Sequence, residues 1–390
     1  MNKIEEMIER LCPDGVEYKP LREVGSITRG GNFQKKDFVE EGLPCIHYGQ
    51  IYTVYGLHTN KTLSFVNDEV WAKSKKARPG DVIMAVTSEN IEDVCKCITW
   101  LGDEEVAISG HTAIIHHELN PKFLTYYFRS SAFEPHKRKL AHGTKVIEVT
   151  PDKLLDVAIP VPPMEIQEEI VRVLDSFAEL EAELEAELEA RKAQYAYYRD
   201  KLLDFSVRGG VALMPLASLA EIGTGSHDTK DALEQGEYPF YARGVDVLAL
   251  DSFDFDETAI ITAGDGVGVG KVMHFVEGKY ALHQRAYRIH ITSPNLIPKY
   301  YYHFMKATFL GYMEKKAVNS SVTSVRKKML EDYPIPIPSL EEQERIVSIL
   351  DKFDMLVNDI SQGLPAEIKA RRKQYEYYRD KLLAFKEKAA

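Results

Sequence analysis

One helical segment occurs twice in this chain, and the repeat limits the folds that the sequence can adopt. Residues 159–205 begin with IPVPPMEIQEEIVRVLDSF and end with QYAYYRDKLLDF, while residues 335–385 begin with IPIPSLEEQERIVSILDKF and end with QYEYYRDKLLAF. The start of the segment recurs 176 residues later and its end 180 residues later. A repeat of this length predicts two similar halves, each ending in one long helix.

The apolar residues of both segments follow the heptad spacing of a coiled coil. From Ile170 they recur in alternating steps of 4 and 3 residues, and only Glu181 and Arg191 interrupt the seam. The second copy takes one extra step of 4 residues around Gly363 and Pro365, so we expect its helix to be kinked or broken there. A heptad seam needs a partner. Antiparallel pairing of the two copies within one chain is the first hypothesis, and pairing with a second chain is the alternative.

The regions before the two helices share only a few turn residues. Pro44 recurs as Pro239 and Gly49 as Gly244, both 195 residues later. Two globular modules have therefore diverged on a common helical scaffold. We predict four regions in chain order: residues 1–158 as the first globular domain, 159–208 as the central helix, 209–334 as the second globular domain, and 335–390 as the C-terminal helix.

Each module is predicted to combine short strands with a helix. In the first, PCIHYGQIY, GDVIMAVTS, CKCITWL and TAIIHH are typical of strands and PKFLTYYFRSSAFEPHKRKL of a helix. In the second, YPFYARGVDVLAL, AIITAG, KVMHFV and AYRIHI are typical of strands and PKYYYHFMKATFLGYMEKK of a helix. The predicted fold class is α+β: two similar α/β domains separated by two long antiparallel coiled-coil helices and related by a pseudo-twofold internal repeat.

The net charge of −11 is concentrated in the central helix. Residues 159–206 hold 12 acidic and 5 basic residues, whereas both modules are near neutral and carry short basic runs that could meet phosphates. No stretch approaches the roughly 20 apolar residues of a membrane span. The spacing of the four cysteines suits neither a disulfide framework nor a zinc site. We therefore expect a cytoplasmic protein with reduced thiols and no metal centre.

No catalytic constellation is recognisable in the sequence. The loop AGDGVGVGK at residues 263–271 departs from the Walker A motif, because Asp265 stands within it and Val272 follows its lysine. A variable contact loop and a plain flexible turn both stay open as its role. Glu367 and Lys369 imitate part of a nuclease signature, but they lie in the predicted coiled coil. Nothing assembles a nucleophile, a base and an oxyanion site, so we expect the chain not to be an enzyme.

The proline turns followed by EIQEEIVRVLD and EEQERIVSILD, the duplicated YYRDKLL helix ends and the opening PDGVEYKPLREV resemble the specificity subunit of type I restriction-modification systems. The resemblance implies two target-recognition domains that each read one half of a bipartite, asymmetric DNA site. It also implies partner subunits, an adenine-N6 methyltransferase and a restriction translocase, which the chain directs to that site. S-adenosylmethionine and ATP are then expected on the partner subunits, and no cofactor on this chain.

Base readout requires polar side chains on loops, supported by phosphate contacts. The candidates in the first domain are Arg29, Asn32, Gln34, Lys35, Lys36, Gln50, Ser88, Asn90, Thr144 and Lys145. The candidates in the second are His227, Lys230, Arg243, Lys271, Gln284, Arg285, Ser320, Ser321 and Arg326. Ordinary surface placement is the alternative for each of them.

The near-identical helix ends predict a docking role beyond packing, because several of their residues lie off the seam. The candidates for partner binding are Tyr197, Arg199, Asp200 and Lys201, with Tyr377, Arg379, Asp380 and Lys381 in the second copy. An alternative function, from another class, is a coiled-coil scaffold that binds two protein partners without recognising DNA. Such a scaffold would show no salt-dependent affinity for DNA.

Overall fold

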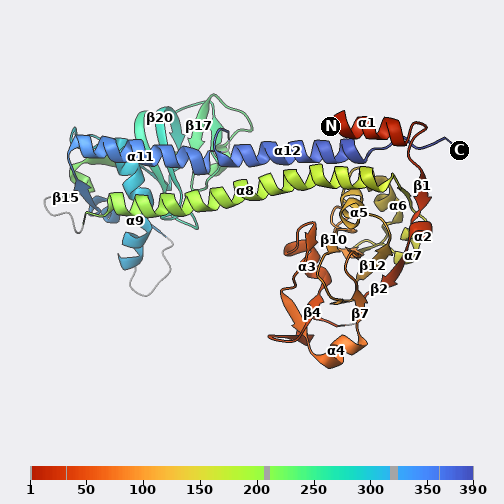
Figure 1. The fold of residues 1–390 in the computed structure, drawn as a ribbon. Coiled ribbons are helices and arrows are strands. Elements are labelled where there is room, and N and C mark those ends of the chain that lie inside the picture. Colours follow the sequence, from red (N-terminus) through yellow and green to blue (C-terminus); the bar gives the residue numbers. More distant parts are fainter. Residues whose placement is uncertain (1, 32, 206–210, 317–323, 360, 390) are drawn as a thin grey trace. The chain divides into compact units, whose positions relative to one another are not determined.

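The computed structural model describes residues 2–31, 33–205, 211–316, 324–359 and 361–389. Two compact units divide the chain, one formed by Met1–Glu183 with Ile368–Ala390 and the other by Leu184–Glu367. The division falls inside both copies of the helical repeat. Each unit therefore contains one globular domain, one part of the central helix and one part of the C-terminal helical segment (Figure 1).

The first unit contains two five-stranded sheets, ordered β2-β12-β8-β10-β5 and β3-β6-β4-β11-β7, and the pairs β1-β14 and β9-β13. Its strands are β1 (Tyr18–Pro20), β2 (Gly25–Arg29), β3 (Phe38–Val39), β4 (Leu43–Ile46), β5 (His58–Thr59), β6 (Ser64–Val66), β7 (Lys75–Ala77), β8 (Val82–Ala85), β9 (Thr87–Ser88), β10 (Cys97–Trp100), β11 (Val106–Ile108), β12 (Thr112–His117), β13 (Ile147–Glu148) and β14 (Ala158–Pro160). Its helices are α1 (Asn2–Leu11), α2 (Leu21–Val24), α3 (Tyr48–Thr53), α4 (Asp68–Lys73), α5 (Pro121–Phe128), α6 (Glu134–Leu140) and α7 (Pro151–Leu154), with parts of α8 (Met164–Leu203) and α12 (Leu364–Leu383).

The second unit is built on a six-stranded sheet, ordered β16-β21-β19-β20-β17-β18, and the pair β15-β22. Its strands are β15 (Ala212–Pro215), β16 (Ala220–Thr224), β17 (Tyr238–Tyr241), β18 (Leu248–Leu250), β19 (Phe255–Ala263), β20 (Met273–Leu282), β21 (Ala286–Ile291) and β22 (Pro334–Ile337). Its helices are α9 (Pro298–Lys316), α10 (Lys327–Glu331) and α11 (Leu340–Asn358), together with the second part of α8.

The two domains share their central strand pairings. In the first unit β12 pairs antiparallel with both β2 and β8, and β4 pairs parallel with β11. In the second unit β21 pairs antiparallel with both β16 and β19, and β17 pairs parallel with β20. The predicted fold of two similar domains with a helical repeat is therefore confirmed.

One segment that was predicted to be a strand forms a strand only in its first half. The segment PCIHYGQIY forms β4 up to Ile46, but its second half is helix α3. The helix starts there because His47 caps it: the Nδ1 atom accepts a hydrogen bond from Gly49 N at 3.1 Å, and Gln50 Oε1 accepts one from His47 N at 2.9 Å. The predicted helix of residues 121–140 is likewise divided into α5 and α6, whereas α9 coincides with its predicted segment.

Within each unit, the parts of the two helical copies pack against each other, and in the first unit their direction is antiparallel. In the first unit the ring of Phe177 on α8 stacks on Tyr378 of α12 with centroids 5.3 Å apart, and Glu181, one turn further along α8, pairs with Arg372 of α12. A rising residue number on α8 therefore meets a falling number on α12, which confirms the predicted direction. The same pairing explains the acidic residue in the seam, since Glu181 has a cationic partner there.

The second unit repeats this aromatic contact with the roles of the helices exchanged. Phe353 of α11, which corresponds to Phe177 in the repeat, stacks on Tyr198 of α8 with centroids 5.8 Å apart. Tyr198 in turn corresponds to Tyr378 of the first unit. An equivalent pair of aromatic rings thus packs the two helices together in both units. The contact joins the start of one copy to the end of the other, which explains why both ends of the segment recur in the sequence.

A buried glutamine attaches the start of each repeated helix to its domain. Gln167 is 2% exposed; its Oε1 accepts from Asn120 N at 2.8 Å and its Nε2 donates to Pro162 O at 2.8 Å. Gln343 is fully buried and makes the same two bonds, to Ile297 N at 2.8 Å and Pro338 O at 2.9 Å. Both amide ends are satisfied by backbone atoms, so the residue fixes the helix on the domain rather than facing solvent.

An aspartate two turns further along each helix makes the second shared attachment. Asp175 accepts from Tyr126 and Lys122, each at 2.7 Å, and Asp351 accepts from His303 Nε2 at 2.6 Å. Burial lowers the pKa of His303, and the neighbouring Asp351 opposes that shift.

The pKa of His303 predicts an acid-sensitive second unit. The ordinary imidazole pKa is about 6.5, so a lower folded-state value means that the unfolded chain binds the proton more readily. The contribution of neutral His303 to the free energy of unfolding is therefore complete above the ordinary imidazole pKa, and it is lost as the pH falls below that value. We expect His303→Gln, which does not titrate, to reduce the loss of stability between pH 7 and pH 5.5. Hydrogen exchange in α9 and α11 measures this; an unchanged pH profile would contradict it.

The break predicted in the second helical segment is confirmed. Helix α11 ends at Asn358 and α12 begins at Leu364. Only glycine fits at position 363, because a Cβ atom there would lie 2.4 Å from the Met355 carbonyl oxygen. Pro365 then stands in the first turn of α12, where its missing N–H breaks no helical bond.

All four cysteines are free thiols, of which Cys45, Cys95 and Cys97 are buried. Burial raises the pKa of each of these three thiols, so none is activated as a nucleophile. Within the described residues, no group of three or more histidine, cysteine or acidic side chains could hold a metal ion. No helix in the same part of the chain is both long enough and apolar enough to span a bilayer.

Candidate nucleic-acid interface

Several turns of the first domain meet where β4, β8 and β11 end. Ser109 N donates to Ile46 O at 3.0 Å and thereby joins the turn after β11 to the end of β4. Gly31 N donates to Ile108 O at 2.8 Å, which places the segment after β2 beside the end of β11. Loops held together in this way on a rigid sheet are the usual place for binding residues.

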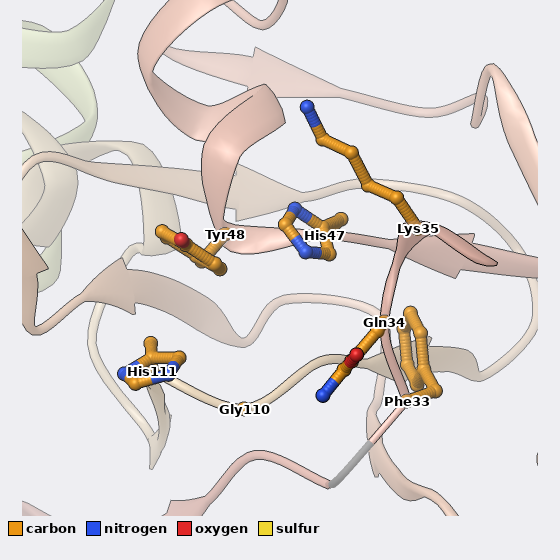
Figure 2. A pocket seen from close by; sticks show the side chains of 7 residues that line it. All are labelled: Phe33, Gln34, Lys35, His47, Tyr48, Gly110 and His111. Carbon is orange, nitrogen blue, oxygen red and sulfur yellow. The ribbon is translucent and has the colours of Figure 1, made fainter. Parts of the chain in front are cut away.

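These turns enclose a cavity of about 620 Å³, lined by Phe33, Gln34, Lys35, His47, Tyr48, Gly110 and His111. Figure 2 shows Tyr48 and His111 on one side of the opening and Phe33 and Gln34 on the other. The rings of Tyr48 and His111 lie 5.1 Å apart, and those of His47 and Tyr48 lie 4.6 Å apart. The cavity therefore presents aromatic faces together with amide, imidazole and ammonium groups.

The surroundings of His47 in this cavity favour its neutral form. Burial lowers the pKa of His47, and the charges of Lys35 and His111 lower it further. His111 has a φ angle of 64°, the left-handed region that non-glycine residues seldom adopt. Backbone held in a rare conformation is common at binding sites, where the surrounding structure compensates for its cost.

The second domain brings the equivalent turns together with the same backbone bonds. His283 N donates to Tyr241 O at 3.0 Å, as Ser109 does to Ile46 in the first domain. Gly264 N donates to Arg285 O at 2.9 Å, as Val86 N does to His111 O at the same distance. Position by position, these bonds place Arg285 where the first domain has His111.

By the same register Arg243 stands where the first domain has Tyr48, since each follows the end of its strand by two residues. Arg243 Nη1 lies 2.8 Å from Asp265 Oδ1, and Arg285 Nη1 lies 3.2 Å from Asp265 Oδ2. The hydrogen bond from Arg243 is the main cause that lowers the pKa of Asp265, and Arg285 adds to it. A shared architecture thus carries different polar side chains in the two domains.

Both halves of the chain match one family, described as the type I restriction modification DNA specificity domain, over residues 13–190 and 209–370. The chain belongs to this family. A putative type I specificity subunit of Haemophilus influenzae is 31% identical over 95% of this chain and 96% of its own length. The specificity subunit of the Escherichia coli enzyme EcoR124I/EcoR124II is 37% identical, over 58% of this chain and 61% of that subunit.

The fold agrees with this assignment. The crystal structure of a type I S subunit from M. genitalium superposes with a TM-score of 0.59 at 14% identity and covers 95% of this chain and 96% of that one. The family is one of specificity subunits and is non-catalytic. The predicted assignment to the type I specificity subunits is confirmed, and the prediction that the chain is not an enzyme agrees with it.

In this specificity subunit the predicted DNA-binding residues of the first domain fall into three groups. Gln34 and Lys35 line the cavity. Gln50 and Asn90 bond within the domain, to Ser64 at 2.8 Å and Asp93 at 2.9 Å. The third group is exposed on the surface and consists of Arg29, Lys36, Thr144 and Lys145. Of the two remaining candidates, Ser88 is half-buried and Asn32 lies outside the described residues.

In the second domain the structure brings Arg243 and Arg285 together on Asp265, and Gln284 Nε2 donates to Asp228 at 2.9 Å. His227 lies 3.4 Å from Asp254. The exposed candidates are Lys230, Lys271 and Arg326, and the candidates outside the described residues are Ser320 and Ser321.

The residues at these turns that were not expected from the sequence are His47, Tyr48, His111 and Asp265. A signal for Tyr48 was available, because the 195-residue offset of Gly49 and Gly244 places it opposite Arg243. In the sequence, Asp265 stands out only as a departure from a nucleotide-binding motif. Its position beside two arginines depends on strand pairing, which no local pattern reveals.

The proposed partner-binding residues lie at the two equivalent helix ends. Tyr197 and Tyr377 are 60% and 62% exposed, so the repeat presents the same ring to solvent twice. Each following arginine pairs with its neighbouring aspartate, Arg199 with Asp200 and Arg379 with Asp380. The remaining candidates are engaged nearby: Lys201 lies over the Tyr197 ring, Asp380 also accepts from Ser131 N, and Lys381 lies 3.2 Å from Glu5.

Proposed function

We propose that each globular domain reads one half of a bipartite, asymmetric DNA site through the turns described above. The observation that carries the proposal is the pair of equivalent loop clusters: one backbone arrangement presents Tyr48 and His111 in the first domain and Arg243 and Arg285 in the second. Equivalent loop clusters with different polar groups are what two different half-sites require.

The helices are proposed to set the unread gap between the half-sites and to bind the methyltransferase subunits. Tyr197 and Tyr377 support the second part, because they are large, half-apolar side chains left exposed at equivalent positions. The E. coli relative is a subunit of a restriction enzyme. Adenine-N6 methylation and restriction, with S-adenosylmethionine and ATP, would then reside on partner subunits. A scaffold without DNA recognition is the disfavoured alternative, since both halves match a DNA specificity domain.

Methylome sequencing tests the proposal. The chain is expressed with its methyltransferase subunit in a host without other adenine methylation, and the modified motif is mapped. We expect two short half-sites separated by a fixed unread gap. Tyr48→Ala should relax bases in one half-site only, while Glu40→Ala, an exposed residue of the same domain outside the cavity, should leave the motif unchanged.

Two results would contradict this proposal. A continuous motif without a gap would refute the two-reader arrangement. A change in both half-sites upon Tyr48→Ala would show that the first domain does not read its bases independently.

A further inference from the structure

We infer that the second domain reads a guanine, through Arg243 and Arg285 held on Asp265, and that Asp265 positions both arginines. The inference rests on the proposed function, since it names the base class that one of the two loop clusters recognises. Guanine presents two acceptors, N7 and O6, at its edge in the major groove. A guanidinium group can donate to both at once, and this pairing is the commonest specific contact between a side chain and a base.

The backbone around both arginines is fixed before DNA arrives. Gly264 N donates to Arg285 O at 2.9 Å, and Arg285 N donates to His283 Nδ1 at 2.9 Å. Arg243 O lies against the glycine-rich loop that carries Asp265, because a Cβ atom at Gly268 would lie 2.4 Å from it. The loop's glycines thus permit a close approach that brings the carboxylate to the guanidinium groups.

The two guanidinium groups remain available to a ligand. The side chains of Arg243 and Arg285 are 41% and 63% exposed, and Asp265 is 29% exposed. In each ion pair the arginine uses its Nη1 atom, and a guanidinium group carries five N–H donors in all. Asp265 therefore restrains the direction of the side chains while leaving further donors for a base edge. Because Asp265 pairs with two arginines, their positive charges offset the repulsion between its carboxylate and DNA phosphates.

The first domain provides an internal comparison. Tyr48 and His111 occupy the positions of the two arginines, and Thr87 follows Val86 where Asp265 follows Gly264. None of the three can form the forked contact of an arginine supported by a carboxylate. The dependence on guanine N7 and O6 through these positions is therefore expected in only one half-site.

The experiment uses the complex of the full chain with its methyltransferase subunit and duplexes that carry the mapped site. Each guanine of the second half-site is replaced in turn by 7-deazaguanine, which keeps base pairing but lacks the N7 acceptor. One such replacement removes one of the two acceptors of a bidentate arginine contact and leaves O6, so it should weaken binding roughly 3- to 10-fold. In complexes with Arg243→Ala or Arg285→Ala, which remove the donors, the same replacement should have little further effect in at least one variant.

Other results would overturn either the inference or the proposed function on which it rests. If the second half-site contains no guanine on either strand, or tolerates every replacement, the inference is wrong. If each alanine variant weakens binding to specific and random duplexes equally, the arginines contact phosphates instead, and the inference is wrong as well. If the wild-type complex modifies no bipartite site at all, the proposed function itself has failed.

Asp265→Asn separates a positioning role from a merely structural one. Removing the carboxylate should reduce the preference for guanine over 7-deazaguanine in the second half-site, while the loss of a negative charge should raise the affinity for random DNA. A folding defect would lower both. An unchanged guanine preference in this variant would show that Asp265 does not position the arginines.

Discussion

Replacing Gln343 with alanine is expected to destabilise the second unit by about 3 kcal/mol, because one backbone N–H group and two carbonyl groups in buried or partly buried surroundings lose their partners, at about 1–3 kcal/mol each when buried. The bonds at stake join Gln343 to Ile297 N and Pro338 O, and a third joins it to Asn295 O at 2.8 Å. Together they attach α11 to the turn before α9. Hydrogen exchange in these two helices should accelerate roughly 100-fold, since every 1.4 kcal/mol corresponds to a factor of ten.

The neighbouring residue supplies the matched control. Glu344 lies on the same helix and is exposed, so Glu344→Ala should change the exchange rates little. The first unit provides a second comparison, because Gln167→Ala removes the same attachment there and should accelerate exchange in α5 and the start of α8 instead. If Gln343→Ala left the protection of α9 and α11 unchanged, the glutamine would not be the attachment described here.

The repeat made the scaffold predictable from the sequence. Residues kept in both copies proved to be the ones that make equivalent contacts: Gln167 and Gln343 bind backbone atoms, and Phe177 and Phe353 stack on equivalent tyrosines. Such contacts depend on two segments that are both duplicated, so the residues that are identical in the two copies indicate them. The pairing of the two copies followed from the heptad seams, and the helix break followed from the extra step of four residues.

The recognition turns could not be predicted in the same way. They have diverged between the domains, and their residues converge through the register of strands far apart in the sequence, as His111 and Val86 or Arg285 and Gly264 do. Local rules also failed at His47, whose side chain caps a helix where an apolar run predicted a strand. Which polar groups face a ligand is decided by strand pairing rather than by local pattern.

Inserting four residues between Leu184 and Leu188 is expected to lengthen the unread gap of the recognised site by one or two base pairs while both half-sites stay the same. Helix α8 runs without interruption from Met164 to Leu203. Four residues add about 6 Å at about 1.5 Å per residue, and DNA rises about 3.4 Å per base pair. The antiparallel partner is already divided into α11 and α12, so it can accommodate the change more readily than one continuous helix.

The length of the insertion decides whether the seam survives. Four residues advance the helix by slightly more than one turn and keep Leu188 close to its original face, whereas two residues rotate it by about half a turn. The two-residue variant should therefore lose the packing of Tyr195 and Tyr198 on Phe353 and abolish methylation. Motif mapping on both variants distinguishes the outcomes. Altered half-site bases with an unchanged gap would mean that the helices do not set the spacing, since a spacer that changes length must change the gap and nothing else.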